Sequence, residues 1–199
     1  MIKKAKSIRT DICQGIGKQA AILIPGWATE AKTLFSQWPR HYDRIESVDT
    51  AGVTLLEQRV ADSDDALCLV GVSLGAYIAV DMATKYPDKI QELHLISMRP
   101  QYPKSECRLI AKALAKNLNA GLERFYQNCL ANPALLPALA EHDAFDVEAL
   151  IEGLQRLSSE DMDTLLRLNC PIFLYHGQQD LIAPYSEWEH WIHTHKHPS

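Results

Sequence analysis

The sequence predicts an α/β protein with a mainly parallel sheet flanked by helices. Short apolar runs alternate with segments of helical periodicity, and the clearest of these runs leads into a serine between two glycines, directly before a helical segment. Strand, helix and strand in succession form βαβ units, whose strands pair in parallel and are covered by helices on both faces.

Five short segments are expected as strands. The clearest are residues 20–24, which stop at Pro25-Gly26, and residues 66–70, which stop at Gly71. A continuous apolar run of this length is typical of a strand buried on both faces. A weaker strand is expected at 44–48, and strands at 93–96 and 172–175 complete the set.

Helical periodicity fills the intervals between these strands. Helices are expected at 32–37, 54–61, 76–85 and 184–194. Residues 100–161 break the alternation, because their leucines and alanines recur at helical spacing without a convincing strand. The expected division is a first part of the core at 1–99, a helical lid at 100–160 and a second part of the core at 161–199. A lid is expected there because ligands of parallel sheets bind beyond the carboxyl ends of the strands.

The composition is that of an ordinary soluble domain. Apolar residues make up 47%, charged residues 23%, and the formal net charge is −5, so disorder and nucleic-acid binding are not expected. The basic residues Lys3, Lys4, Lys6 and Arg9 are expected at a solvated end. There is neither a signal-peptide pattern nor an apolar stretch of about 18 residues. Five separated cysteines suit a reducing cytoplasm, and no metal or other cofactor is expected.

Gly71-Val-Ser73-Leu-Gly75 is the motif with the clearest chemistry. The pattern G-x-S-x-G between a strand and a helix forms a tight turn that exposes the serine hydroxyl at the edge of a sheet. Small flanking residues are needed because a side chain there would collide with the neighbouring backbone. Ser73 is therefore the candidate nucleophile, and the backbone N–H of Leu74 is a candidate donor to an oxyanion.

Two further segments complete a candidate site. Pro25-Gly26-Trp27 follows the first buried strand, where the N–H of Trp27 could be the second oxyanion donor; the alternative is a plain strand-ending turn. Asp180 lies in the loop after a late buried strand and could orient a histidine. His176 is too close to Asp180 in sequence to be its partner and is expected to be structural.

These segments resemble the α/β-hydrolase superfamily over nearly the whole chain. Within it, the sequence is similar to the pimeloyl-acyl-carrier-protein methyl ester esterases of biotin synthesis. The segments that carry the resemblance are Pro25-Gly-Trp27, Gly71-Val-Ser-Leu-Gly75, Ile96-Ser-Met-Arg-Pro100, Leu122-Glu-Arg-Phe125, Gly153-Leu-Gln-Arg-Leu157 and residues 161–180.

The resemblance implies a substrate and a partner. It implies that Trp27, Phe125, Tyr126 and Cys129 contact the acyl chain, and that Arg124 meets an acidic acyl-carrier protein. The expected function is a serine hydrolase acting on the methyl ester of a carrier-bound pimeloyl group. A general short-chain carboxylesterase or thioesterase acting on a small-molecule ester stays open, as does a hydrolase-fold binding protein with impaired catalysis.

The general base is left unassigned. In the resembled family the catalytic histidine follows a further strand, and only 19 residues follow Asp180 in this 199-residue chain. The last strand is therefore expected to be missing. Histidines 190, 193, 195 and 197 crowd this end, but a helix of about ten residues carries the chain roughly 15 Å away from the Asp180 loop. The histidines elsewhere are no better candidates for the general base. They are His41, His142 and His94, of which the last is expected inside a buried strand.

Overall fold

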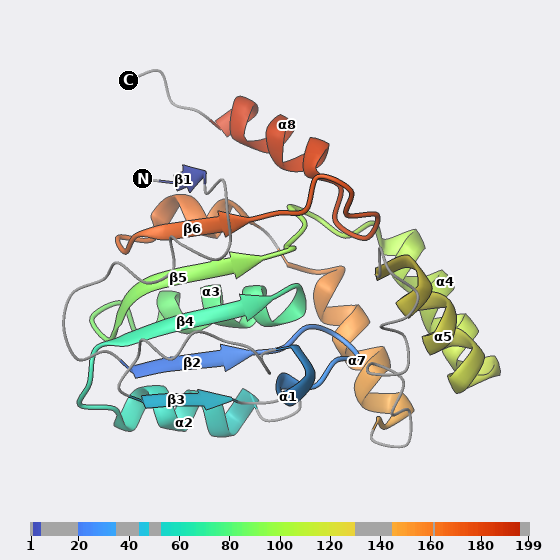
Figure 1. Ribbon diagram of the computed structural model, residues 1–199, viewed down its shortest axis with the longest axis horizontal. Coiled ribbons are helices and arrows are strands. Elements are labelled where there is room, and N and C mark those ends of the chain that lie inside the picture. Colours follow the sequence, from blue (N-terminus) through green and yellow to red (C-terminus); the bar gives the residue numbers. More distant parts are fainter. Residues whose placement is uncertain are drawn as a thin grey trace. The chain divides into compact units, whose positions relative to one another are not determined.

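A six-stranded sheet dominates the structure, a computed structural model that describes residues 2–4, 20–34, 44–47, 53–129, 145–160 and 162–195 (Figure 1). In chain order the elements are β1 (Ile2–Lys4), β2 (Ala20–Ile24), α1 (Ala31–Leu34), β3 (Arg44–Ser47), α2 (Val53–Asp62), β4 (Leu67–Val72), α3 (Leu74–Lys85), β5 (Ile90–Ile96), α4 (Lys104–Lys116), α5 (Leu118–Cys129), α7 (Val147–Leu157), the 3₁₀ helix η4 (Met162–Arg167), β6 (Ile172–Tyr175) and α8 (Tyr185–His195).

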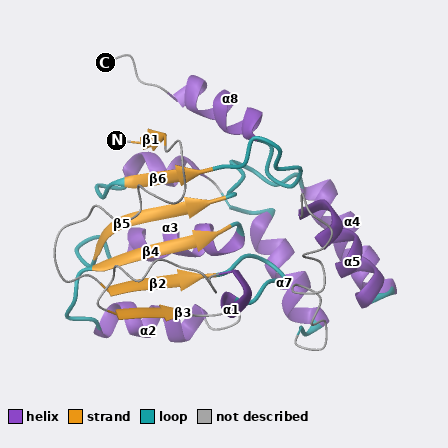
Figure 2. Ribbon diagram, viewed as in Figure 1, coloured by secondary structure: helices purple, strands orange, loops and turns teal. Residues whose placement is uncertain are grey.

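All neighbouring strands pair in parallel, in the order β1-β6-β5-β4-β2-β3 (Figure 2). The five predicted strands are therefore confirmed, with small differences at their ends. β4 continues through Gly71 to Val72, and α3 begins at Leu74, so that only Ser73 separates strand from helix. The strand can extend into the motif because a glycine fits between the sheet and the following helix.

β1 is not predicted by the sequence pattern. It pairs with β6 through Ile2↔Ile172 and Lys4↔Leu174, and it forms an edge of the sheet. Three residues that include two lysines show no alternation of apolar and polar positions, so a strand here depends on the partner strand rather than on local sequence. The expected solvated end is thus a paired edge strand over Ile2–Lys4.

The core of the sheet lies around β2 and β4. Every residue of β2 is buried, as are Leu67–Gly71 of β4. α3 packs against β4, β5 and β2, and its residues Tyr77 and Ile78 are at most 1% exposed. This burial on both faces is why the predicted strands read as continuous apolar runs.

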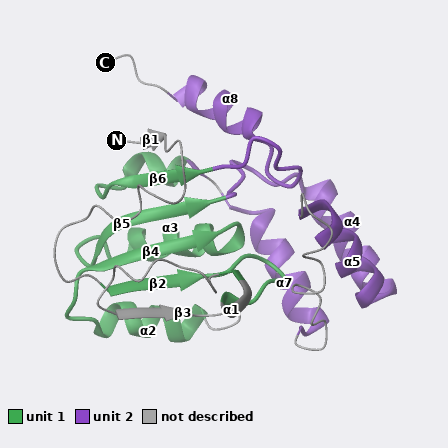
Figure 3. Cartoon of the chain, in the orientation of Figure 1, with its two compact units in different colours: residues 1–96, 163–175 green, residues 97–162, 176–199 purple. Residues whose placement is uncertain are grey.

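The chain divides into two compact units (Figure 3). One contains the sheet and comprises residues 1–96 and 163–175; the other comprises 97–162 and 176–199. The first boundary falls near the expected end of the core at residue 99, whereas residues 176–199 group with the helical segment. In the second unit α4 packs against α5 and α7, and the described residues of the expected lid contain helices without a strand.

After β6 the described chain continues into α8, without a further strand up to His195. Of the helices in the described ranges, none has the length and apolar character that crossing a membrane requires.

Candidate functional site

Ser73 occupies a strained turn between β4 and α3. Its backbone has φ 50° and ψ −112°, a left-handed φ that non-glycine residues seldom adopt. The turn is held by a hydrogen bond of 2.9 Å from the Ser73 N–H to the carbonyl of Ile96, at the end of β5. Such strain persists only where surrounding structure enforces it, and it is concentrated at functional sites.

The two glycines of the motif are required by close backbone contacts. A Cβ on Gly71 would lie 2.5 Å from the Cα of Ala76, and a Cβ on Gly75 would lie 2.7 Å from the carbonyl carbon of Ile24. Backbone atoms cannot move aside as a side chain can, so only glycine fits at either position. These contacts press α3 against the ends of β4 and β2.

The loop after β2 lies directly beside Ser73. Ile24 pairs with Gly71 in the sheet, so both strands end at the same edge. A Cβ built on Gly26 would lie 3.4 Å from the Cβ of Ser73. The structure therefore brings Trp27, Ser73 and Leu74 together in the unit that contains the sheet. Trp27 and Leu74 are each 3% exposed, and Leu74 is the first residue of α3, where backbone N–H groups have no acceptor within the helix.

Two residues that the sequence analysis does not single out shape this loop. Thr29 donates a 2.9 Å hydrogen bond from Oγ1 to the carbonyl of Gly26, and Ala28 has φ 53°. The contact made by Thr29 could have been predicted from the sequence, because Ser and Thr hydroxyls often form hydrogen bonds to the backbone of nearby residues. A positive φ at alanine has no signal in the sequence.

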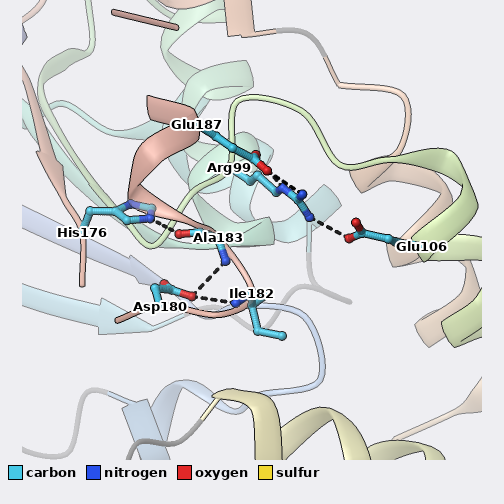
Figure 4. A network of polar contacts seen from close by, with 7 residues as sticks. All are labelled: Arg99, Glu106, His176, Asp180, Ile182, Ala183 and Glu187. Atoms are coloured by element: carbon cyan, nitrogen blue, oxygen red, sulfur yellow. Dashed lines mark hydrogen bonds and ion pairs between the residues drawn. The ribbon is translucent and has the colours of Figure 1, made fainter. Parts of the chain in front are cut away.

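Asp180 caps its own loop in the second unit (Figure 4). Its Oδ1 accepts hydrogen bonds of 2.9 Å from the N–H groups of Ile182 and Ala183. The carboxylate is thereby fixed through one oxygen, while its other oxygen retains its acceptor capacity. The His176 ring contacts the carbonyl of Ala183 through Nε2, so both side chains are tied to the same short loop.

Three of the predicted acyl-contact residues, Phe125, Tyr126 and Cys129, lie on α5 in the same unit as Asp180, whereas Trp27 belongs to the unit that contains the sheet. Desolvation raises the pKa of the Cys129 thiol, and the negative charge of Asp180 acts in the same direction. Phe125 is half-buried and its ring centroid lies 5.7 Å from that of Tyr126, which is fully buried. Arg124 is exposed.

Arg99 joins α4 and α8 within the second unit. Arg99 donates to Glu187 of α8 through Nε at 2.7 Å and Nη2 at 2.6 Å, and to Glu106 of α4 through Nη1 at 2.7 Å (Figure 4). The fork-shaped pairing with Glu187 is the strong bidentate type. Hydrogen bonding to Glu187 raises the pKa of Arg99 further above its usual range, although burial opposes this.

Apart from His176, the histidines within the described residues lie on β5 and α8. His190 and His193 are exposed on α8, and His195 stacks on Trp191 with ring centroids 4.6 Å apart. His94 is buried inside β5, as predicted. Three other histidines, His41, His142 and His197, lie outside the described residues.

The chain is similar in sequence to two curated esterases. No protein-family model matches the chain. It is 28% identical over 134 residues to a pimeloyl-[acyl-carrier protein] methyl ester esterase of Chromobacterium violaceum, covering 58% of this chain and 52% of that protein. It is 30% identical over 143 residues to the protein of the same name from Nitrosospira multiformis, covering 62% and 54%. The chain thus spans about half the length of these curated relatives.

Solved hydrolase structures share the fold. A hydrolase from Pseudomonas aeruginosa superposes with a TM-score of 0.72 at 17% identity, covering 86% of this chain and 76% of that one. An enol-lactonase from Burkholderia xenovorans gives 0.70 at 13% identity, with coverage of 88% and 79%. A thermophilic esterase from Thermogutta terrifontis gives 0.67 at 18%, with coverage of 90% and 78%.

Proposed function

Because the chain has the fold of solved α/β hydrolases and is similar in sequence to two curated esterases, we propose that it hydrolyses carboxylic esters with Ser73 as the nucleophile. The observation that supports this most directly is the turn at Ser73, with φ 50° and flanking glycines that admit no side chain. The loop that contains Gly26 lies beside the Cβ of Ser73. A turn of this kind is maintained at a cost in free energy of roughly 1–3 kcal/mol, which a purely structural role does not require.

The proposed reaction uses an acyl-enzyme. The Oγ of Ser73 attacks the ester carbonyl carbon, and the carbonyl oxygen becomes an oxyanion that accepts hydrogen bonds from the N–H groups of Trp27 and Leu74. Collapse of this intermediate expels the alcohol and leaves the acyl group on Ser73. Water then attacks the acyl-enzyme and releases the acid.

Asp180 is proposed as the acid that orients the general base. One carboxylate oxygen is already fixed by the Ile182 and Ala183 amides. The remaining acceptor capacity can hold an imidazole N–H and stabilise its protonated form. The histidine itself stays unassigned.

The proposed substrate is the methyl ester of a pimeloyl group carried on acyl-carrier protein. The names of the two relatives support it. Phe125, Tyr126 and Cys129 are proposed to contact the acyl chain, together with Trp27. Arg124 is exposed and could meet an acidic carrier protein. The expected location is the cytoplasm, where such a carrier would be encountered.

A fluorophosphonate probe tests the nucleophile. Wild type should be labelled covalently and Ser73→Ala should not, because only an activated serine reacts. Ser105→Ala, which removes an exposed serine on α4, is the matched control and should be labelled like wild type. Hydrolysis of a nitrophenyl ester should follow the same pattern. Equal labelling of wild type and Ser73→Ala would refute the assignment, and an unlabelled wild type would favour the binding-protein alternative.

Growth without biotin tests the substrate. Expression of the chain should restore growth to a bacterial strain that lacks its pimeloyl-carrier esterase, and Ser73→Ala should not. If nitrophenyl esters are cleaved but growth is not restored, the general carboxylesterase or thioesterase is the better description. Comparison of oxygen esters with thioesters of equal acyl length then separates those two activities.

A further inference from the structure

A polar cluster lies within the buried sheet, apart from Ser73 and Asp180. Cys68 is on β4, and Glu92 and His94 are on β5, the neighbouring strand (Figure 1). Cys68 is 0% exposed and the side chain of His94 is 1% exposed, whereas that of Glu92 is 15% exposed. The proposed ester hydrolysis uses none of the three.

An irregularity in strand pairing brings these side chains together. Leu67 pairs with Ile90 but Cys68 pairs with Glu92, so one extra residue, Gln91, is inserted into β5. Without this insertion Glu92 and His94 would face the opposite side of the sheet from Cys68, because a shift of one residue reverses every side chain. Bulges of this kind re-aim side chains and are concentrated near functional sites.

The three ligand-type atoms converge. Cys68 Sγ, a Glu92 carboxylate oxygen and a His94 ring nitrogen all lie within 4.8 Å of one another. His94 Nε2 is 3.3 Å from Glu92 Oε1. Nitrogen and oxygen ligands about 2.0–2.1 Å from a tetrahedral zinc ion are themselves about 3.3 Å apart. This pair is therefore already at the separation that a shared metal ion requires.

The orientation of the His94 ring is fixed by two residues of β6. Its Nδ1 lies 2.9 Å from the Tyr175 hydroxyl, and its ring stacks on Phe173 at a centroid distance of 4.8 Å. Its Nε2 is buried and makes no hydrogen bond within the described residues, although it faces Glu92 Oε1 at 3.3 Å. A histidine that ligates a metal through one nitrogen usually uses the other in such an outer hydrogen bond. A buried nitrogen without a hydrogen bond, aimed at a thiol and a carboxylate, is otherwise costly.

We propose that Cys68, Glu92 and His94 bind one divalent metal ion, with zinc as the ion that these ligand types favour. Sulfur, nitrogen and carboxylate oxygen are the usual zinc ligands. On binding, the Cys68 thiol releases its proton to solvent, and the resulting thiolate and the Glu92 carboxylate balance the two positive charges. Three protein ligands leave the fourth position to water. The ion links β4 to β5 at the bulge.

Cobalt substitution in the 199-residue chain tests the site. Metal-free protein titrated with Co²⁺ should bind one equivalent, with the visible bands of tetrahedral cobalt and a near-ultraviolet thiolate-to-cobalt band. Zn²⁺ should displace the cobalt and raise the melting temperature, because a ligand that binds only the folded state stabilises it. Absence of the thiolate band in wild type would overturn the proposal even if no variant folded.

Variants locate the bound ion. Cys68→Ala should abolish the thiolate band and the zinc-induced rise in melting temperature, while Cys107→Ala, which removes a buried thiol on α4, should change neither. Tyr175→Phe should weaken zinc binding about 10–100-fold, as loss of an outer partner does. The pair His190→Gln and His193→Gln should leave binding unchanged. Loss of binding in that pair, with retention in Cys68→Ala, would place the ion on the exposed face of α8 and refute the buried site.

Discussion

At the scale of single residues, the backbone of Ser73 is the costliest feature of the candidate site. Its φ is positive, and a Cβ added at Gly71, Gly75 or Gly26 would come close to neighbouring backbone or to Ser73 itself. These contacts explain why small residues surround the serine. They also make the turn a rigid platform on which the hydroxyl has little freedom to move.

Gly75→Ala should destabilise the protein severely. The new Cβ would lie 2.7 Å from the carbonyl carbon of Ile24, so α3 or β2 must shift. Thermal unfolding should show a loss of several degrees or no folded protein. Gly177→Ala is the matched control, because its Cβ would be 3.7 Å from that of Asp180, an ordinary contact. A Gly75→Ala variant as stable as wild type would contradict the described packing.

Asp180→Asn should separate catalysis from loop structure. Asparagine keeps an oxygen acceptor for the Ile182 and Ala183 amides but loses the negative charge that would stabilise a protonated histidine. We expect a melting temperature close to that of wild type and a kcat lowered by up to about 10⁴-fold. Asp180→Ala should lose both. An unchanged kcat in Asp180→Asn would remove Asp180 from the proposed catalytic residues.

At the scale of elements, helices of the second unit begin and meet at specific polar contacts. Asp146 caps α7 by accepting a 3.0 Å hydrogen bond from the Ala149 N–H. α4 and α5 are separated by Asn117 alone, whose Oδ1 accepts from the Ala120 N–H. Arg99 then joins α4 to α8 through Glu106 and Glu187. The helices thus depend on polar joints as well as on apolar packing.

Arg99→Lys should loosen the attachment of α8. Lysine keeps the charge but cannot form the bidentate pair with Glu187 while also reaching Glu106. Because both carboxylates are partly exposed, we expect a modest loss of about 1–3 kcal/mol in unfolding free energy, measured by urea denaturation. In Arg99→Lys, amide hydrogen exchange should become faster in α8, while the exchange rates of β4 should change less. Arg167→Lys, at an exposed position, is the control. Equal protection of α8 in wild type and Arg99→Lys would contradict this role.

At the scale of the whole molecule, charge bears on the proposed carrier partner. The chain has a formal net charge of −5, so an acidic carrier protein would be repelled unless local positive charges attract it. Arg124 is exposed on α5, the same helix as Phe125. Local charge of this kind chiefly affects the rate of encounter.

Arg124→Glu should therefore lower kcat/KM for the carrier-linked ester, with the larger effect at low salt because ions screen exposed charges. The free methyl ester should be cleaved as by wild type, since it carries no acidic protein. Arg108→Glu on α4 is a matched charge reversal. Equal losses in both variants would indicate a general effect of charge rather than a contact at Arg124. No loss in either would remove Arg124 from the proposed carrier contact.

The elements that the sequence predicts are those whose cause is local. β2 and β4 are apolar throughout because a central parallel strand is buried on both faces. The turn at Ser73 is predictable because its steric requirement selects two glycines at fixed spacing. The position of Asp180 in a loop is predictable because an apolar strand precedes it in the sequence. The structure shows in addition that its Oδ1 accepts hydrogen bonds from the Ile182 and Ala183 amides.

Features that depend on register or on distant partners are decided only by the tertiary structure. The pairing of β1 with β6 and the positive φ of Ala28 leave no local pattern. The bulge at Gln91 is the clearest case, since it turns His94 and Glu92 toward Cys68. The sequence by itself determined the strands, the helices and the serine turn, because periodicity and backbone sterics act over a few residues. Which side chains meet across the sheet was determined by pairing between strands that lie more than 20 positions apart, as Cys68 and Glu92 do.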